Sequence, residues 1–509
     1  IVFGDWSSDV CSSDLETISS YSGEGDYPYT FLNGGDMLGD VLIGRISAET
    51  VEQLSIIFSK IYSYERDINN SPTDAGWFNR MLLIGDPSSS GVSCIYTNLY
   101  VKELAQRANP NYSFIENYSS GFSTTINSGI NQGVGFFNYR GFSGMSGWSP
   151  TTSLVNNPRF PHAVILTCNT GNFASSSSAG TSEKLIRLGT SANPTGAVTA
   201  TGMATGGTHT MFNNLLTSAI FNSIFSLNMR TMGEAVFNAK MNINKVYGVS
   251  HSNQAKYFAH WCNLMGDPSM EVFVGIPKSL VINYNSSLPL GSTIIDVQVT
   301  NENAACVENV TVTAYSNTLN TVVASGYTDE FGRVSLNIEN GVSSELLLTA
   351  SKHDYKPSQF TVNVGQGGIV YHSKAVFDNG MHGSQGNSDA VASAGETIAI
   401  LLSVKNTSNQ SIASLTGVAT TSDPDVSILS GDFSIGELSP NGVQQSTNEI
   451  LLSINNSITP FHDIRLNVNI TDNLGSQHNF PVHVLAYNAS LSIEDYTISA
   501  GGNNVLDPA

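Results

Sequence analysis

Short apolar segments alternate with segments of helical periodicity over residues 27–274, and this alternation constrains the fold more than any other feature of the chain. The apolar segments are residues 41–45, 81–84, 135–139, 163–167 and 197–200. The helical segments are residues 47–61, 100–107, 182–188, 211–225 and 231–246. Ser47 is the expected N-cap of the first helix. Strands that are apolar throughout are typical of a sheet covered on both faces, so the alternation predicts an α/β fold with a mostly parallel sheet and helices on both faces.

Beyond Pro277 the helical periodicity stops, and short strands recur with turn signals between them. The sequence Asp329-Glu330-Phe331-Gly332 predicts a hairpin turn that joins strands at 322–327 and 333–338. Residues 276–365 are therefore expected to form an immunoglobulin-like β-sandwich, and residues 366–487 a second β-sandwich. Because residues 502–509 resemble residues 386–396, the segment 488–509 is expected to be the truncated start of a further β module.

Length and composition fit this division. A chain of 509 residues is too long for one hydrophobic core, and we expect roughly two to four domains. Charged residues make up only 12% of the chain and hydrophobic residues 40%, which is typical of β-rich extracellular modules. The net charge of −20 comes without a basic stripe, which argues against nucleic-acid binding. No apolar run approaches the ~18 residues that a membrane helix needs.

The first residues are expected not to belong to the protein. Residues 5–15 read DWSSDVCSSDL, which on back-translation resembles a common short-read sequencing adapter. We therefore interpret residues 1–15 as an assembly artefact and expect the α/β domain, over residues 16–275, to lack its true N-terminus. Without Cys11 the chain has four widely spaced cysteines, which do not form a disulfide framework: Cys94, Cys168, Cys262 and Cys306.

Two strand ends carry the chemistry that the sequence suggests, because open parallel sheets bind ligands at the carboxyl ends of their strands. One is the segment 136–144, and the other is the segment 164–173. Cys168 directly follows a buried strand and precedes the turn at Gly171, which is the expected position of a nucleophile. The alternative is a small buried residue, since free cysteines are usually part of a core.

The residues around these strand ends resemble the gingipain-like cysteine peptidases, a family with the caspase fold. Its motif Cys-x-x-Gly-x-Phe is intact at Cys168, Gly171 and Phe173, and the frame of its motif Tyr-x-Gly-His-Gly-Ser-x-x-x-Trp is kept at Tyr139, Gly141 and Trp148. Further matches lie at residues 26–29, 41–49, 64–65, 77–80, 231–233 and 263–269, so the resemblance covers roughly residues 26–360. It implies a caspase-like α/β domain followed by an immunoglobulin-like domain.

The departure from the family pattern concerns the catalytic base. The family's catalytic His falls on Phe142, and Ser143-Gly144 replace Gly-Ser. In the family, that His supports the Cys thiolate and protonates the leaving amine, which Phe cannot do. A free Cys has a pKa near 8.5, and loss of the base typically removes several orders of magnitude in rate. An oxyanion hole built from backbone N–H groups near Gly141 and Cys168 needs no particular side chain.

Another histidine could replace the missing base. His162 precedes Cys168 on the same strand by about 20 Å and would lie at the wrong end of the sheet. His209 follows the strand at 197–200, in a loop that leaves the same sheet edge as Cys168, and is the candidate substitute base. The alternative for His209 is an ordinary polar loop residue. His251 and His260 lie near the end of the domain and belong to no motif.

Other polar and aromatic residues are weaker candidates. The resemblance implies that the loop containing Thr205 lines the substrate pocket, and Trp148 and Phe173 are candidate walls of that pocket or residues of the core. Asp36 and Asp40 are candidate ligands of a structural calcium ion, but a solvated turn is the alternative because their spacing does not fit an EF-hand loop. Glu183 is interpreted as a first-turn acid that faces a helix dipole.

The resemblance implies a secreted cysteine endopeptidase that acts on protein or peptide substrates by attack of the Cys168 thiolate and requires no cofactor. Phe142 favours an alternative function: a catalytically dead pseudo-peptidase that serves as a peptide-binding or adhesive surface scaffold. A third interpretation is a purely structural surface protein. By resemblance, relatives come from Bacteroidetes-type bacteria and are exported by the type IX secretion machinery through a C-terminal domain absent here. This implies an extracellular or cell-surface location.

Overall fold

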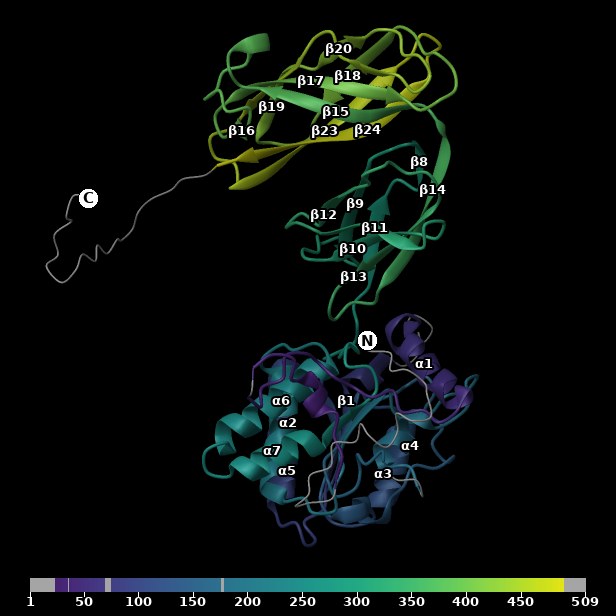
Figure 1. The fold of residues 1–509 in the computed structure, drawn as a ribbon, viewed down its shortest axis with the longest axis vertical. Helices are drawn as coiled ribbons and strands as arrows, with labels where there is room; N and C mark the ends of the chain where they lie inside the picture. Colours follow the sequence, from purple (N-terminus) through teal and green to yellow (C-terminus); the bar gives the residue numbers. More distant parts are fainter. Residues whose placement is uncertain (1–22, 35, 69–74, 175–177, 489–509) are drawn as a thin grey trace, which may run out of the picture. The chain divides into compact units, whose positions relative to one another are not determined.

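The computed structural model describes residues 23–34, 36–68, 75–174 and 178–488, and the chain divides into two compact units (Figure 1). The first unit holds the chain up to Leu280 together with Ser351–Pro357. The second unit holds Val281–Ala350 and the chain from Ser358 onward. The predicted artefact at 1–15 and nearly all of the predicted further module at 488–509 lie outside the described residues.

Six described strands of the first unit form one sheet in the order β2-β1-β3-β4-β5-β6. They are β1 (Arg80–Gly85), β2 (Ser113–Asn117), β3 (Phe136–Arg140), β4 (His162–Ile165), β5 (Thr199–Met203) and β6 (Cys262–Met265). The first five strands pair in parallel, and β6 runs antiparallel at one edge. Sequence analysis missed β2 and β6. The predicted strand at 41–45 is wrong, because that segment joins the sheet only through one bridge between Arg45 and Met265.

Seven described α-helices accompany this sheet: α1 (Val51–Glu65), α2 (Ser93–Ala108), α3 (Phe122–Gln132), α4 (Thr181–Arg187), α5 (Thr210–Phe225), α6 (Met232–Tyr247) and α7 (Ser252–Trp261). Short 3-10 helices lie at η1 (Tyr27–Thr30), η3 (Ala75–Asn79) and η4 (Ser143–Gly147). The predicted N-cap Ser47 is wrong: the Thr50 hydroxyl accepts the Gln53 N–H and begins α1, while the Ser47 hydroxyl donates to Glu183. None of the described helices is long and apolar enough to cross a membrane.

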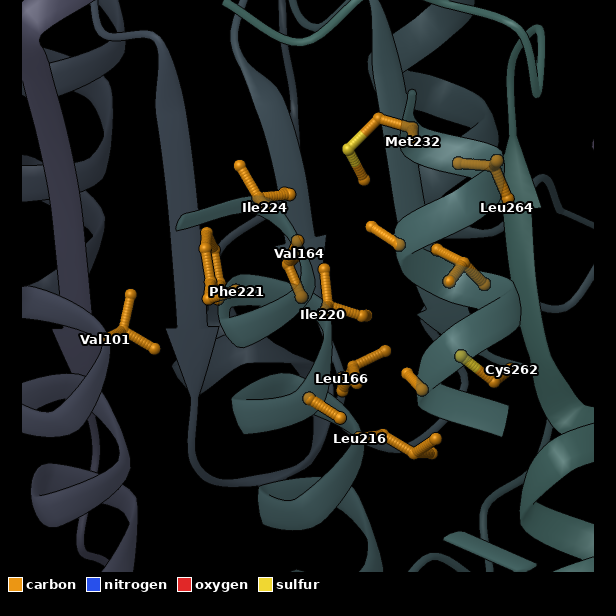
Figure 2. Packing of buried hydrophobic residues seen from close by; sticks show 14 of the residues in the cluster. Val101, Val164, Leu166, Leu216, Ile220, Phe221, Ile224, Met232, Cys262 and Leu264 are labelled. Carbon is orange, nitrogen blue, oxygen red and sulfur yellow. The ribbon is translucent and has the colours of Figure 1, made fainter. Parts of the chain in front are cut away.

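The helices cover both faces of the sheet, as the apolar strands predicted. Side chains alternate along a strand, and along β1 Met81 and Leu83 join one buried cluster while Leu82 and Ile84 join another. Figure 2 shows the first cluster, in which Val164 and Leu166 pack beside apolar side chains of α5 such as Ile220. The sheet therefore has a buried apolar layer on each side.

The first part of the second unit has two sheets, in the orders β11-β10-β13-β14-β8 and β12-β9-β7. Their strands are β7 (Leu280–Tyr284), β8 (Ser287–Leu290), β9 (Ile294–Asn301), β10 (Thr311–Ser316), β11 (Thr321–Tyr327), β12 (Arg333–Asn337), β13 (Leu346–Ser351) and β14 (Ser358–Gly367). The turn after Asp329 exists, since Gly332 N–H donates to Asp329 O at 2.9 Å. The predicted hairpin is wrong, however, because β11 pairs with β10 and β12 pairs with β9 in the opposite sheet.

The remaining strands form a second sandwich with sheets β15-β17-β22-β19, to which β21 is added at β17, and β16-β24-β23-β18-β20. The strands of the first sheet are β15 (Ile369–Phe377), β17 (Thr397–Asn406), β19 (Val426–Ser430), β21 (Val443–Gln445) and β22 (Ile450–Ile454). Those of the second are β16 (Ala392–Ser393), β18 (Leu415–Thr420), β20 (Asp432–Ile435), β23 (Phe461–Thr471) and β24 (Gln477–Tyr487). A short 3-10 helix, η5, spans Met381–Gly383. Alternate side chains of both sheets meet in one buried cluster.

Candidate active site

The register of β3 and β4 brings the two predicted motifs together. These strands pair in parallel, with Phe136 opposite His162 and Asn138 opposite Val164. The same offset of 26 residues, which separates Phe136 from His162, aligns Gly141 with Thr167 and Phe142 with Cys168 beyond the strand ends. A hydrogen bond from the Thr167 hydroxyl to Gly141 O, at 2.9 Å, holds the two loops in this register. The nucleophile candidate and Phe142 therefore lie in the loops that follow two neighbouring strands.

Cys168 lies in a loop that is fastened to the end of β5. The Asn169 N–H donates to Thr205 O at 2.9 Å, and the Gly171 N–H donates to Met203 O at 3.0 Å. Asn169 has a φ of 55°, a left-handed conformation that Asn adopts at lower cost than most residues. Gly171 is required by close packing, because a Cβ there would lie 2.4 Å from the carbonyl carbon of Gly202. The loop thus presents Cys168 on a backbone that is anchored on both sides.

The Cys168 side chain is half-buried, and its thiol contacts Thr208. The distance between Cys168 Sγ and Thr208 Oγ1 is 3.1 Å, and either atom can be the donor. Sequence analysis missed Thr208, although it lies in the loop identified for His209, because hydroxyl residues in a Gly-rich loop carry no distinctive signal. This contact gives the sulfur a hydrogen-bonding neighbour but no base, since a Thr hydroxyl does not accept a proton at neutral pH.

Phe142 is exposed to solvent over 45% of its surface. The backbone around it is fixed by Tyr139, whose hydroxyl donates to Phe142 O at 3.2 Å and lies 2.6 Å from Ser146 Oγ. Ser146 in turn donates to the Asp86 carboxylate. An exposed aromatic ring therefore stands where the family places an imidazole, on a loop that is ordered by its own hydrogen bonds.

His209, the candidate substitute base, forms a helix cap. His209 is the N-cap residue of α5, and its Nδ1 accepts the Met211 N–H at 3.2 Å. Its ring packs edge-on against Phe212 with 6.0 Å between the ring centroids. These contacts direct the ring along α5, while the neighbouring Thr208 occupies the position against the sulfur. Among the described residues no hydrogen bond joins the His209 imidazole to Cys168, and a helix-capping role accounts for the contacts that this ring makes.

The other histidines of this domain are structural. His162 begins β4, is fully buried, and bonds Thr199 Oγ1 at 2.8 Å and Tyr64 OH at 3.0 Å. Burial lowers the pKa of His162 to about 3, so the ring stays neutral at the end of the sheet away from Cys168, as predicted. Burial likewise lowers the pKa of His260 to about 4. His251 Nδ1 lies 2.9 Å from Ser250 Oγ, and its ring packs against α5.

Arg140 is a buried cation beneath the cysteine that sequence analysis missed. It is only 1% exposed, and its guanidinium donates to Leu166 O and, at 2.9 and 2.8 Å, to Asn214 Oδ1. Burial lowers the pKa of Arg140 to about 10, while the nearby Cys94, Tyr139 and Cys168 favour its charged form. The signal was present in the sequence, because Arg140 fills the variable position directly before Gly141. A positive charge at this place favours negative charge on the loop above it.

The remaining candidates of the pocket lie close to the cysteine loop or in the core. Thr205 is buried, and besides its bond to Asn169 its Oγ1 accepts the Gly207 N–H at 3.2 Å. Phe173 packs under the Arg45 guanidinium, which lies 3.9 Å from the ring centroid. Trp148 is 4% exposed, packs on Phe137 and donates from Nε1 to Asn127 Oδ1 at 2.8 Å, which favours the core alternative for this residue.

The acidic candidates have local partners. Asp40 Oδ2 accepts the N–H groups of Leu32 and Asn33 at 2.8 and 2.9 Å, and Asp36 Oδ1 accepts the Leu38 N–H at 2.9 Å. These bonds are those expected of a solvated turn. Glu183 accepts the Gly180 N–H at 2.9 Å in the first turn of α4, as the sequence predicted.

Comparison with known proteins supports the resemblance. The profile of peptidase family C25 matches residues 1–273. Gingipain R1 of Porphyromonas gingivalis is 24% identical over 351 residues, which are 65% of this chain and 33% of that protein, and gingipain R2 is 24% identical over 65% of this chain and 45% of that protein. The chain thus spans a third to a half of the length of these relatives.

Solved structures show the same fold. The crystal structure of gingipain R, described as an Arg specific cysteine proteinase, superposes with a TM-score of 0.60 at 20% identity and covers 69% of this chain and 81% of that chain. A complex of the pro- and mature domains from Porphyromonas gingivalis superposes with a TM-score of 0.57 at 19% identity, covering 67% of this chain and 81% of that chain. The predicted fold class, a caspase-like α/β domain followed by β modules, is confirmed. Because the profile covers more than half of its residues, the chain belongs to peptidase family C25.

Proposed function

We propose that this chain is a cysteine endopeptidase of greatly reduced turnover, with Cys168 as its nucleophile. The observation that carries the proposal is the shared edge of β3 and β4, where the loops that contain residue 142 and Cys168 follow paired strands and the Thr167 hydroxyl bonds Gly141 O. A half-buried thiol on an anchored loop at the carboxyl end of a parallel sheet is placed for attack on a bound peptide. Family membership makes a protein or peptide the expected substrate.

The chemistry proceeds in two steps, and Phe142 slows both. In the first step the Cys168 sulfur bonds to the peptide carbonyl carbon, its proton passes to solvent, and the carbonyl oxygen becomes an oxyanion that backbone N–H groups near Gly141 and Cys168 would bind. Collapse breaks the C–N bond, and the leaving amine takes a proton from water. In the second step water hydrolyses the thioester and restores the thiol. General acid–base assistance contributes about 10²–10⁴-fold in such reactions, and Phe142 supplies none.

A peptide-binding pseudo-peptidase is the second candidate, and it is favoured by the contacts of His209. Nδ1 of His209 caps α5 and the ring packs on Phe212, and among the described residues no imidazole forms a hydrogen bond with the sulfur. In this alternative the three loops that contain Phe142, Cys168 and Thr205 bind extended peptides without cutting them. The partner would be a protein at the cell surface rather than a substrate.

Labelling of the thiols separates the two candidates. The chain offers an internal control, because Cys306 is exposed whereas Cys94 and Cys262 are buried, with burial raising the pKa of both buried thiols. Wild type is treated at pH 7 with acyloxymethyl ketone peptides, arginyl peptides among them since gingipain R is described as Arg specific, and each cysteine is quantified by mass spectrometry. The peptidase predicts that Cys168 is labelled at least tenfold faster than Cys306. Equal rates, with peptide binding retained, would establish the pseudo-peptidase instead.

Secretion and location are part of the same proposal. Relatives of this family imply export by the type IX secretion machinery and an extracellular or cell-surface location, and the low charged fraction of 12% supports such an environment. Fractionation of the producing bacterium, with antibodies to the described β-sandwiches, tests the location. Recovery of the chain in the cytoplasm alone would refute it.

A structural calcium ion at Asp36 and Asp40 stays a proposal, tested by the effect of chelation on the melting temperature.

A further inference from the structure

We propose that Asp423, Asp425 and His462 form a site for a divalent first-row transition metal, Zn²⁺ in particular, in the second β-sandwich. One ligand atom from each of these side chains lies within 4.8 Å of the other two. In the part of the chain that the structure describes, this is the one such group of three His, Cys, Asp or Glu side chains. The site is independent of Cys168 and of the proposed peptidase activity.

The three residues come from two segments that the fold brings together. Asp423 and Asp425 lie in the loop between β18 and β19, where the chain crosses from one sheet of the sandwich to the other. His462 is the second residue of β23, which pairs with β18. Pro424 separates the two aspartates and fixes the backbone between them. An ion held here would link the crossover loop to a central strand of the module.

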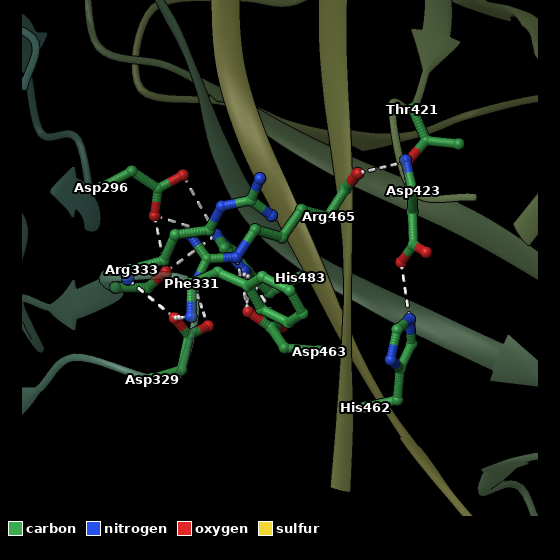
Figure 3. A network of polar contacts seen from close by, with 11 residues as sticks. Asp296, Asp329, Phe331, Arg333, Thr421, Asp423, His462, Asp463, Arg465 and His483 are labelled. Carbon is green, nitrogen blue, oxygen red and sulfur yellow. Dashed lines mark hydrogen bonds and ion pairs between the residues drawn. The ribbon is translucent and has the colours of Figure 1, made fainter. Parts of the chain in front are cut away.

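The first pair of the site is already in contact. His462 Nε2 lies 2.7 Å from Asp423 Oδ2, and these side chains are only 13% and 10% exposed. Figure 3 shows the Asp423 carboxylate pointing at the edge of the His462 ring, away from the neighbouring cluster around His483. Thr459 Oγ1 lies 3.4 Å from Nδ1 of the same ring and is placed to accept its proton. A proton bridges Nε2 and Oδ2 at this distance, and a bound cation would displace it while Thr459 accepts the hydrogen bond from Nδ1–H, which is how an outer partner fixes the tautomer of a metal-binding His.

Asp425 supplies the second carboxylate. Its backbone is fixed, because its N–H donates to Asp423 Oδ1 at 3.0 Å and its carbonyl accepts the Asn455 N–H at 2.8 Å. Its carboxylate, by contrast, has one weak contact, from Asn455 Nδ2 at 3.4 Å. Two neighbouring carboxylates repel each other, and a divalent cation bound between them removes that repulsion. The free oxygens of Asp425 are therefore available to an ion.

The donor set and its spacing select the kind of ion. One imidazole with two carboxylates suits Zn²⁺ and its first-row neighbours, whereas calcium takes oxygen ligands only. In a tetrahedral Zn²⁺ site the ligand atoms lie about 3.3–3.5 Å apart. The His462–Asp423 contact of 2.7 Å must open slightly, and the widest separation, which is at most 4.8 Å, must close by a rotation of the partly exposed Asp425 side chain. Water would complete the coordination.

Metal binding by the full chain tests the proposal. Binding of ZnCl₂ is measured against a competing indicator after the thiols have been alkylated, so that cysteines do not contribute. We expect one equivalent of Zn²⁺ per chain, and an affinity at least tenfold lower for His462→Ala and for Asp425→Asn. Asp425→Asn keeps the size of the side chain, so it reports on the site even if His462→Ala disturbs the fold. A Co²⁺-loaded sample should show absorption of nitrogen and oxygen ligands without a thiolate band.

His478→Ala is the matched control. His478 Nε2 lies 3.8 Å from Asp472 Oδ2 in the same sandwich, without a third ligand among the described residues. We expect this variant to bind Zn²⁺ like wild type. The proposal is overturned if His462→Ala and Asp425→Asn bind as wild type does, if His478→Ala loses as much binding as they do, or if CaCl₂ binds at the site and ZnCl₂ does not.

Discussion

Cys168 Sγ lies 3.1 Å from Thr208 Oγ1, and this hydroxyl is the polar side chain that the structure places against the candidate nucleophile. The resemblance to the family predicts an imidazole at position 142 to assist the thiolate, and this chain has Phe142 there. A hydroxyl cannot act as the base, but it can donate a hydrogen bond to a thiolate once the proton has left. We therefore expect Thr208 to stabilise a Cys168 thiolate by a hydrogen bond without taking part in the proton transfer.

Thr208→Val tests this relationship. Loss of the hydroxyl should slow labelling of Cys168 by an electrophilic peptide several-fold, because a hydrogen bond to a charged group is worth about 1.5–3 kcal/mol and only part of that charge has formed when the reagent reacts. Thr208→Ser keeps the hydroxyl and should react like wild type. The measurement is the rate constant for Cys168 by peptide mass spectrometry, relative to the exposed Cys306. An unchanged Cys168 rate in Thr208→Val would show that the contact is only packing.

Phe142→His should restore the missing base. Residue 142 follows Gly141, which the Thr167 hydroxyl bonds next to Cys168, and residue 142 is 45% exposed, so an imidazole can replace the ring without disturbing the core. We expect peptidase turnover to rise by about a hundredfold or more, the low end of what general acid–base assistance contributes. The assay is cleavage of fluorogenic arginyl and lysyl peptides, with Phe142→Leu and the double variant Phe142→His with Cys168→Ala as controls. Equal turnover of Phe142→His and Phe142→Leu would contradict the alignment of the two motifs.

The layers of the sheet and the position of Cys168 directly after a buried strand could be predicted from the sequence, because both depend on local residue patterns. Apolar segments such as 163–167 encode a strand covered on both faces, and the turn after Cys168 is encoded by Gly171. The predictions that failed depend on contacts between residues far apart in the sequence. Ser47 and Thr50 are both good N-caps, and the pairing of Ser47 with Glu183, 136 residues later, decides between them.

Contacts between distant residues also explain why the predicted hairpin is wrong and why some contacts of the site were not predicted. Strands β11 and β12 are joined by a true turn, but their partners β10 and β9 lie in opposite sheets, which local turn chemistry cannot reveal. The contact of Thr208 with Cys168 depends on the bonds that fasten the Cys168 loop to the end of β5. His209 follows in the same loop, and its role as the cap of α5 depends on where that helix begins.

Gly171→Ala should destabilise the first unit. A Cβ at residue 171 would meet the carbonyl carbon and oxygen of Gly202 at 2.4 and 2.5 Å, and these backbone atoms cannot move away without disrupting β5. We expect a loss of about 2–4 kcal/mol in unfolding free energy, a range typical of overpacking and of backbone displacement. Gly206→Ala in the neighbouring loop is the control, because its Cβ would have no contact closer than 3.3 Å, to a side-chain atom of Asn169. Urea unfolding monitored by tryptophan fluorescence reports on this unit, and equal midpoints for both variants would contradict the packing argument.

His483 should make the second unit sensitive to alkaline pH. Its Nε2 lies 3.0 Å from Asp296 Oδ1 on β9, and its Nδ1 lies 3.1 Å from Asp463 Oδ2 on β23 (Figure 3). Ser335 Oγ is 3.2 Å from Nε2, and Arg465 bonds Asp463 beside it at 2.8 Å. Burial opposes the charge, but the hydrogen bonds and charges of the two carboxylates outweigh it and raise the pKa of His483 from 6.5 to about 9.

The sign of the pH dependence follows from that direction. A pKa raised in the folded state means that the protonated ring stabilises the unit fully below pH 6.5, and that this stabilisation is lost as the pH rises through about 9. The stabilisation amounts to no more than about 3 kcal/mol. Hydrogen exchange measured by mass spectrometry should therefore show β9 and β24 opening more readily at pH 10 than at pH 7 in wild type, after correction for the intrinsic exchange rate. His483→Gln should abolish most of this difference, whereas the exposed His372→Gln should retain it. If His483→Gln keeps the full difference between the two pH values, the ring does not carry the charge that links Asp296 to Asp463.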